Sequence, residues 1–308
     1  MLDKMLRDLI HGEFTIGKKK IAFLDILLLA GTTVTGIMIR QPIFGISGNP
    51  VISGGMKMII YCVLDFVLAA LMAWFVWTTT KNTLKTVGVY SLAVIWPAIA
   101  GNSALNGGSE VFYAVLLLLL LCVLCKRKTM GVKSFWCVTA LTCAVQILEA
   151  DPYGSKLTNF WPNAYTLFSE TGFLQEYGVA GKFLVLGILL IFFYYLSKKT
   201  FEVTPKTLLA SGLFFSLFVS MFYPFMNYRS GLFANVFAIL LFFFDQKKFY
   251  VPMAMCIISY TSYGYAYGSE IEVVRWIYAL ALAGLMLDAG VYLYQQVKAG
   301  MKHEADEA

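Results

Sequence analysis

The chain has 308 residues, of which 59% are hydrophobic and 14% are charged, and its mean hydropathy is +0.72. This balance excludes an ordinary soluble domain and indicates a protein with many membrane-spanning helices. The segments expected between those helices are short and carry no glycine-rich nucleotide motif. We therefore expect no nucleotide-driven reaction and no nucleic-acid partner.

Neither the histidines nor the cysteines indicate a catalytic, disulfide or metal site. The two histidines, His11 and His303, lie in the terminal tails, which excludes histidine catalysis within the membrane body. No disulfide framework or metal site is expected, because all six cysteines lie in apolar segments. They are Cys62, Cys122, Cys125, Cys137, Cys143 and Cys256. We expect no cofactor, and although a divalent metal stays open, no residue pattern indicates one.

The apolar stretches predict an all-α integral membrane protein of about ten transmembrane helices in a single domain, residues 21–294. The first 20 residues are charged and show no cleavable signal, so the first helix is expected to stay as an anchor. The expected spans are 21–39, 56–77, 86–100, 111–125, 134–148, 181–196, 207–226, 231–244, 250–267 and 276–294.

Basic residues predict the orientation of these spans. With the N-terminus inside, the inner segments hold 18 of the 24 lysines and arginines, and every inner segment has at least two. Cytoplasmic loops are enriched in such residues. Residues 1–20 and the tail 295–308 are therefore expected to be cytoplasmic. The long segment 149–180 is expected outside, where its aromatic residues suggest an interfacial amphipathic helix.

Two outer segments carry candidate site residues. Arg229 lies in a tight hairpin between two apolar runs, where it is either a headgroup anchor or a group that holds a phosphate by its planar fork. Glu110 follows the small, polar loop that begins at Pro97 and opens the next span. It is either a carboxylate that stabilises a helix N-terminus or a site acid facing an outer cavity.

The stretch from Asn102 to Tyr113 resembles the Asn-Ser-Ala-x-Trp-Gly-Gln-x-Asp-x-x-Tyr motif of bacterial membrane mannosyltransferases of the GT-C superfamily. These enzymes are related to those that add mannose to glycosylphosphatidylinositol anchors. Glu110 takes the place of the aspartate, while Asn106 and Gly108 replace the tryptophan and the glutamine. The matching residues are Asn102, Ser103, Ala104, Gly107 and Tyr113.

Weaker pieces follow in the same order as in that superfamily. Gln146 matches a glutamine, 162–165 resembles Pro-Asn-Ile-Tyr, 226–230 resembles Met-His-Glu-Arg-Tyr, and 259–260 resembles a later Ser-Tyr. The resemblance implies a GT-C-like bundle and a polyprenyl-phosphate-linked sugar as donor at the outer face. It places a lipid phosphate on Arg229 and the reacting acid on Glu110, with Glu149 or Asp151 second. Further substrate contacts would come from Asn102, Asn227, Gln146, Asn163 and Tyr165, with Trp161 and Tyr165 lining the lipid entrance.

The chain also departs from the superfamily pattern. The first outer loop, 40–55, has no carboxylate, so the usual general base is missing, and the His-Glu pair of the later motif is lost. Either the base is relocated or the protein is a non-catalytic relative. A polymerase or ligase of lipid-linked glycans, and a transporter or accessory subunit, stay open as alternatives. The expected surroundings are the bilayer of a bacterial plasma membrane and other envelope-glycan assembly proteins.

Three acids lie within apolar spans. Asp25 is expected to pair locally with Lys18 to Lys20. Asp65 and Asp288 are either helix-bonded residues of the bundle interior or functional groups, since a charge at that depth is unfavourable. A transporter would require both of them to face one cavity among broken helices.

Overall fold

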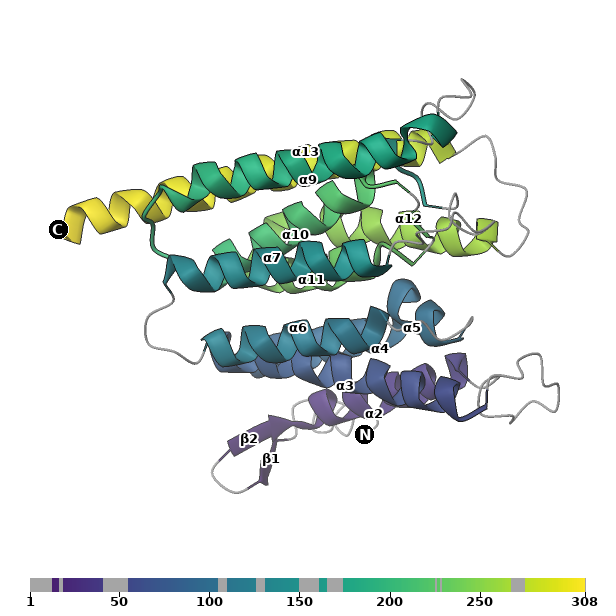
Figure 1. Ribbon diagram of the computed structural model, residues 1–308. Helices are drawn as coiled ribbons and strands as arrows, with labels where there is room; N and C mark the ends of the chain where they lie inside the picture. The colour runs from purple at the N-terminus through teal and green to yellow at the C-terminus, as the bar shows by residue number, and fades with distance from the viewer. Residues whose placement is uncertain are drawn as a thin grey trace.

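The structure is a computed structural model that describes residues 13–16, 19–40, 55–104, 110–125, 131–149, 161–164, 174–224, 226–227, 229–266 and 275–307. Its helices lie side by side along a common direction (Figure 1). The expected helical class is confirmed. A short antiparallel ladder precedes the first helix and pairs Phe14 with Ile21.

The elements are helices apart from one short hairpin and one 3₁₀ turn. In chain order they are β1 (Glu13–Ile16), β2 (Lys19–Ala22), α2 (Phe23–Ile39), α3 (Gly55–Thr80), α4 (Thr83–Ile95), α5 (Pro97–Ala104), α6 (Glu110–Cys125), α7 (Val132–Glu149), α9 (Leu174–Ser197), α10 (Pro205–Phe222), α11 (Leu232–Phe244), the 3₁₀ turn η3 (Gln246–Lys248), α12 (Tyr250–Ala266) and α13 (Arg275–Glu307).

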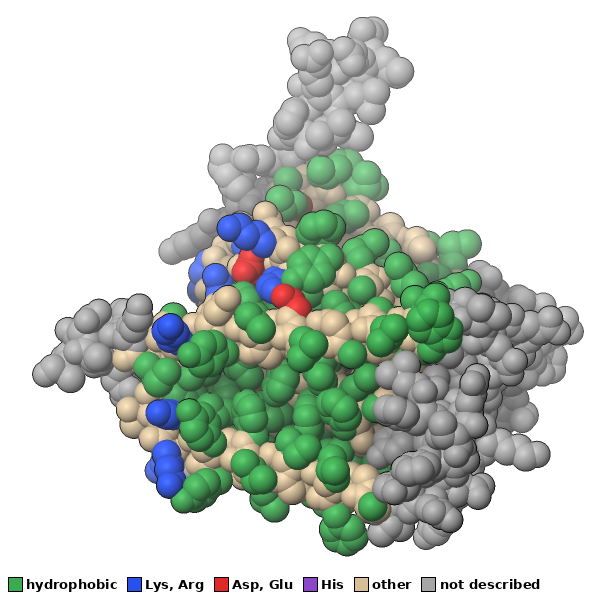
Figure 2. Space-filling view, turned by 90° about the horizontal axis from the view of Figure 1, so that it is seen from above, with side chains coloured by type: hydrophobic (Ala, Val, Ile, Leu, Met, Phe, Trp, Pro, Cys, Tyr) green, Lys and Arg blue, Asp and Glu red, His purple; other side chains and the backbone are tan. Residues whose placement is uncertain are grey.

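Several of these helices have the length and composition of membrane spans. Among the described residues three qualify, Ile59–Thr80, Pro205–Phe222 and Trp276–Met301, and the bent pair α4–α5 makes a fourth if it is one span. Large hydrophobic side chains cover the face formed by α9 and α13 (Figure 2). The chain thus has the apolar helices of a membrane protein, while the ten spans and the cytoplasmic termini stay predictions.

The helix ends alternate between the two ends of the bundle. The end of α6, the start of α7, the α9–α10 connection and the C-terminal end of α13 lie at the left in Figure 1. The ends of α2, α5 and α12 lie at the right. We call these the left end and the right end. Lys198 and Lys199, which are expected inside, lie in the α9–α10 connection at the left end.

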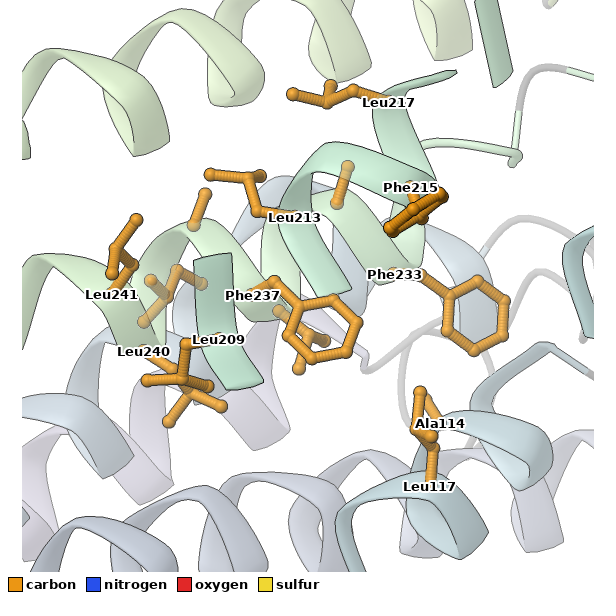
Figure 3. Packing of buried hydrophobic residues seen from close by; sticks show 14 of the residues in the cluster. Ala114, Leu117, Leu209, Leu213, Phe215, Leu217, Phe233, Phe237, Leu240 and Leu241 are labelled. Atoms are coloured by element: carbon orange, nitrogen blue, oxygen red, sulfur yellow. The ribbon is translucent and has the colours of Figure 1, made fainter. Parts of the chain in front are cut away.

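The core is built around α11, which is apolar on all sides. Every residue from Leu232 to Leu241 is buried, as expected for a helix without a polar face. Figure 3 shows α10 and α11 packed through leucine and phenylalanine side chains. They approach closely at Gly212, where an added Cβ would lie 2.3 Å from Cε1 of Phe237. Position 212 therefore has room only for glycine.

Pro97 bends the chain between α4 and α5 by 47°. Proline has no N–H and pushes the preceding residue out of the helical region, and Trp96 is accordingly extended, with φ −66° and ψ 128°. The carbonyls of the last turn of α4 then need other donors. Ala93 accepts from the Trp96 N–H at 3.3 Å, and Val94 accepts from Nη1 of Arg40 at 3.1 Å.

The close approach of α2 to this bend predicts an asymmetry between two glycines. An added Cβ at Gly36 would lie 2.2 Å from Cγ1 of Val94, whereas at Gly31 nothing lies within 4 Å. We expect Gly36→Ala to destabilise the protein by about 1–3 kcal/mol through overpacking. Gly31→Ala, the matched control on the same helix, should leave the melting temperature in detergent unchanged or slightly raised. Equal melting temperatures for both variants would contradict this packing.

Candidate functional site

Polar side chains from three elements meet where α6 begins. Glu110 is the first residue of α6, and its side chain is only 3% exposed. Its Oε1 lies 3.8 Å from Nη1 of Arg229, whose side chain is 18% exposed. The helix N-terminus also favours the carboxylate, because its backbone N–H groups carry partial positive charge. Two residues 119 positions apart in the chain are thus joined as an ion pair.

The turn between α10 and α11 positions Arg229. The backbone N–H of Arg229 donates to Oδ1 of Asn227 at 2.8 Å, a local arrangement typical of asparagine in turns. Nε2 of Gln146, near the end of α7, donates to the carbonyl of Ser230 at 3.0 Å. Four residues predicted from the sequence, Glu110, Gln146, Asn227 and Arg229, are therefore brought together in one cluster, which we call the right-end cluster.

Several buried polar atoms near this end lack a hydrogen-bond partner within the part of the chain that the structure describes. They are Oε2 of Glu110, Oε1 of Gln146 and both side-chain polar atoms of Asn102. Buried polar atoms are nearly always paired, so each such atom calls for an explanation. A polar ligand or water molecules at this end would supply the missing partners.

A second polar network, centred on Asn235, lies next to the turn that carries Arg229. Oδ1 of Asn235, on α11, accepts from Nε1 of Trp96 at 2.7 Å. Its Nδ2 donates to the carbonyl of Gly231 at 2.8 Å and to the Ser259 hydroxyl at 2.7 Å. Asn235 thus ties the bend after α4 to the first turn of α11 and to α12. The sequence reasoning missed it, although an asparagine within an otherwise apolar helix was a visible signal.

Two side chains of the segment expected outside are buried in the bundle. Trp161 is fully buried and Asn163 is 5% exposed. The indole of Trp161 lies against Gly231, where an added Cβ would come within 2.3 Å of its Cη2. Trp161 packs into the bundle because glycine at 231 leaves room for its indole, and the lipid entrance expected along this segment stays a prediction. Glu149 is the last residue of α7, while Asp151 and Tyr165 lie outside the described residues.

Asp65 forms a buried ion pair that the sequence reasoning did not anticipate. Its Oδ2 lies 2.9 Å from Nη2 of Arg40 and accepts from Nε of Arg40 at 3.0 Å. It also accepts a hydrogen bond from the Ser103 hydroxyl on α5. Arg40 is fully buried and Asp65 is 1% exposed. The sequence predicts Arg40 at the start of the outer loop. In the structure it is the residue after α2, and its side chain turns inward, because a buried charge needs a partner.

Asp288 is held in a different cluster. Both of its carboxylate oxygens accept from Nζ of Lys248 at 2.8 Å, and Oδ2 also accepts from the Tyr250 hydroxyl at 2.7 Å. Burial lowers the pKa of Lys248, but its hydrogen bonds to Asp288 and Tyr250 outweigh this and leave the pKa above its ordinary value. Among the described residues Asp65 and Asp288 thus have separate partners.

Comparisons with models of protein families, with curated proteins and with solved structures find no match. Among the described residues, no three His, Cys, Asp or Glu side chains lie close enough to hold a metal ion. What the structure defines is a bundle of apolar helices of the membrane-protein class with a buried acid and an arginine at its right end.

The Arg40–Asp65 pair predicts a large and partner-dependent effect on stability. Arg40→Met leaves the Asp65 carboxylate buried without its cation, which should lower the free energy of unfolding by about 3–5 kcal/mol. Adding Asp65→Leu should restore much of this loss, because no buried charge remains. Denaturation in detergent followed by circular dichroism measures both variants.

Lys248→Met is the matched control for this prediction. The Lys248–Asp288 pair is 15% and 34% exposed, and ion pairs that water reaches contribute about 1 kcal/mol or less. If Arg40→Met destabilises no more than Lys248→Met, the buried pair does not hold α2, α3 and α5 together.

Proposed function

We propose that the protein is a GT-C-like membrane glycosyltransferase of cell-envelope glycan assembly, which transfers a sugar from a polyprenyl-phosphate donor at the outer face. The observation that carries the proposal is the buried Glu110 beside Arg229, with Oε2 of Glu110 lacking a partner among the described residues. This places a proton acceptor next to a group suited to phosphate. The described ends of α2, α5 and α12, which border segments expected on the outer side, lie at the same end (Figure 1).

Glu110 would serve as the relocated general base. The first outer loop of this chain lacks the carboxylate that the superfamily has there. Glu110 is the buried acid of the right-end cluster. In the transfer, the acceptor hydroxyl loses its proton to Oε2 while its oxygen forms a bond to the anomeric carbon of the sugar. The bond from that carbon to the phosphate oxygen breaks. A base held near the acceptor in this way contributes typically about 10²–10⁴-fold to the rate.

Arg229 would hold the donor phosphate and stabilise the polyprenyl phosphate as it leaves. A planar guanidinium makes two parallel charge-assisted hydrogen bonds to phosphate oxygens. Its distance of 3.8 Å from Glu110 keeps donor and base in neighbouring positions. Gln146 acts through the backbone, since it holds the carbonyl of Ser230 next to Arg229. It is therefore a positioning residue.

A lipid-linked glycan polymerase or ligase is the second candidate. It would use the same donor chemistry and the same arginine, and would differ in taking a glycan chain as acceptor. The transporter alternative is less well supported, because Asp65 pairs with Arg40 and Asp288 pairs with Lys248. Other envelope-glycan assembly proteins remain the proposed partners.

Glu110→Gln tests the base. The amide keeps the shape of the side chain but cannot accept the proton, so transfer of labelled sugar from a polyprenyl-phosphate donor should fall at least about 10²-fold. Binding of the donor should change little. Asp245→Asn, a carboxylate at the left end that caps η3, is the control and should leave transfer unchanged. Full activity in the Gln variant would reject Glu110 as the base.

Arg229→Lys and Arg229→Ala separate a phosphate ligand from a headgroup anchor. A lysine keeps the charge but loses the paired geometry, so both variants should bind polyprenyl phosphate about tenfold or more weakly, as the loss of charge-assisted hydrogen bonds requires. Isothermal titration in detergent measures the affinity, with Lys85→Ala as the control. An affinity in Arg229→Lys equal to that of the unmodified protein would show that Arg229 is only an anchor.

A further inference from the structure

A groove opens between α9 and α13 on the apolar face shown in Figure 2. Its volume is about 450 Å³, and its floor is formed by α10. The side chains that line it are aliphatic or aromatic. They include Phe192 and Tyr195 of α9, Phe214 of α10, and Leu287, Val291 and Tyr294 of α13.

Gly290, which has no side chain, helps to shape the groove. Gly290 of α13 lies at its base, where an added Cβ would come within 3.0 Å of Cε2 of Phe214. The ring of Phe214 therefore packs directly on the backbone of α13, and the neighbouring walls stand apart. Leu287 and Val291 keep 64% and 56% of their surfaces exposed, so they present apolar surface that no described element covers.

The length of the groove matches one leaflet of a membrane. From Leu287 to Val297 the helix advances ten residues, or about 15 Å. This is about half of the hydrocarbon thickness of a bilayer, which is about 30 Å. A chain lying in the groove would therefore run from the middle of the bilayer to the left end of the bundle.

Positive charge gathers where the groove reaches the left end. Lys198 and Lys199 follow the last lining residue of α9, and Lys298 follows the last lining residue of α13. Nζ of Lys199 lies 5.6 Å from the ring centre of Tyr195, which lines the groove. Figure 2 shows lysine and arginine side chains along one edge of this face.

At this charged end a backbone contact joins the connection between α9 and α10 to α13. The N–H of Glu202 donates to the carbonyl of Gly300 at 3.4 Å. An added Cβ at Gly300 would lie 2.5 Å from the carbonyl oxygen of Glu202. This contact brings the segment after Lys199 against α13 two residues beyond Lys298. The one carboxylate of Glu202 only partly offsets the charge of the three lysines.

We infer that the groove binds an anionic phospholipid, with one acyl chain along α13 and the phosphate between Lys199 and Lys298. An apolar groove about one leaflet long with lysines at its end is complementary to a lipid with an acyl chain and an anionic headgroup, and fits a lipid without net charge less well. Basic residues beside the membrane attract anionic headgroups, and each lysine raises the binding affinity by a factor of about five. This site is distinct from the right-end cluster and does not depend on the proposed glycosyl transfer.

Native mass spectrometry of the full chain in detergent tests the site, with dioleoyl phosphatidylglycerol as the anionic probe and dioleoyl phosphatidylcholine as the zwitterionic one. Phosphatidylglycerol should bind more tightly. Lys199→Gln with Lys298→Gln should weaken it about tenfold or more while leaving phosphatidylcholine unchanged. The control is Lys81→Gln with Lys247→Gln, two exposed lysines away from the groove.

Filling the groove should have a separate effect. Val291→Trp, or Leu287→Trp at a second exposed position, should displace the acyl chain and weaken binding of both probes. Leu280→Trp, which is exposed on the same helix outside the groove, should not. Equal affinity for the two lipids, or unchanged phosphatidylglycerol binding in both filling variants, would overturn the inference. So would loss of a dimer in Val291→Trp with lipid binding intact, since the groove would then be an interface between two copies.

Discussion

The buried contact between Arg40 and the bend after α4 is the interaction on which much of the architecture depends. Pro97 ends α4 and leaves carbonyls without helical donors. One guanidinium then donates to the carbonyls of Gly36 and Val94 and pairs with Asp65. Because an isolated charge is strongly unfavourable at this depth, Arg40 and Asp65 fix each other's position. This joins α2, α3, α4 and α5 at one point.

That junction sets the position of the right-end cluster. The direction of α5 after the bend is fixed by the hydrogen bond from Ser103 to Asp65 and by the hydroxyl of Tyr263, which donates to the carbonyl of Ala98 at 3.2 Å. The chain then reaches Glu110, where α6 begins beside the turn that carries Arg229. The Arg40–Asp65 pair thus helps to position the Glu110–Arg229 pair.

The two ends of the bundle carry different kinds of chemistry. At the right end, buried polar atoms without partners among the described residues surround Glu110. At the left end, lysines border an apolar groove and Lys248 holds Asp288. The proposed lipid site and the proposed site of sugar transfer therefore lie at opposite ends of the bundle.

The sequence by itself determined the helical class and the apolar character of the helices, because both depend on local hydrophobicity, while the number and orientation of the spans stay predictions. It also singled out Glu110, Gln146, Asn227 and Arg229 as candidates. It did not show that Arg40 turns inward to meet Asp65, that Trp161 packs on Gly231, or that Asp288 pairs with Lys248. Those pairs join residues between 25 and 70 positions apart. Only the tertiary structure decided them, because a buried charge or indole takes whichever partner the packing of separate helices brings within reach.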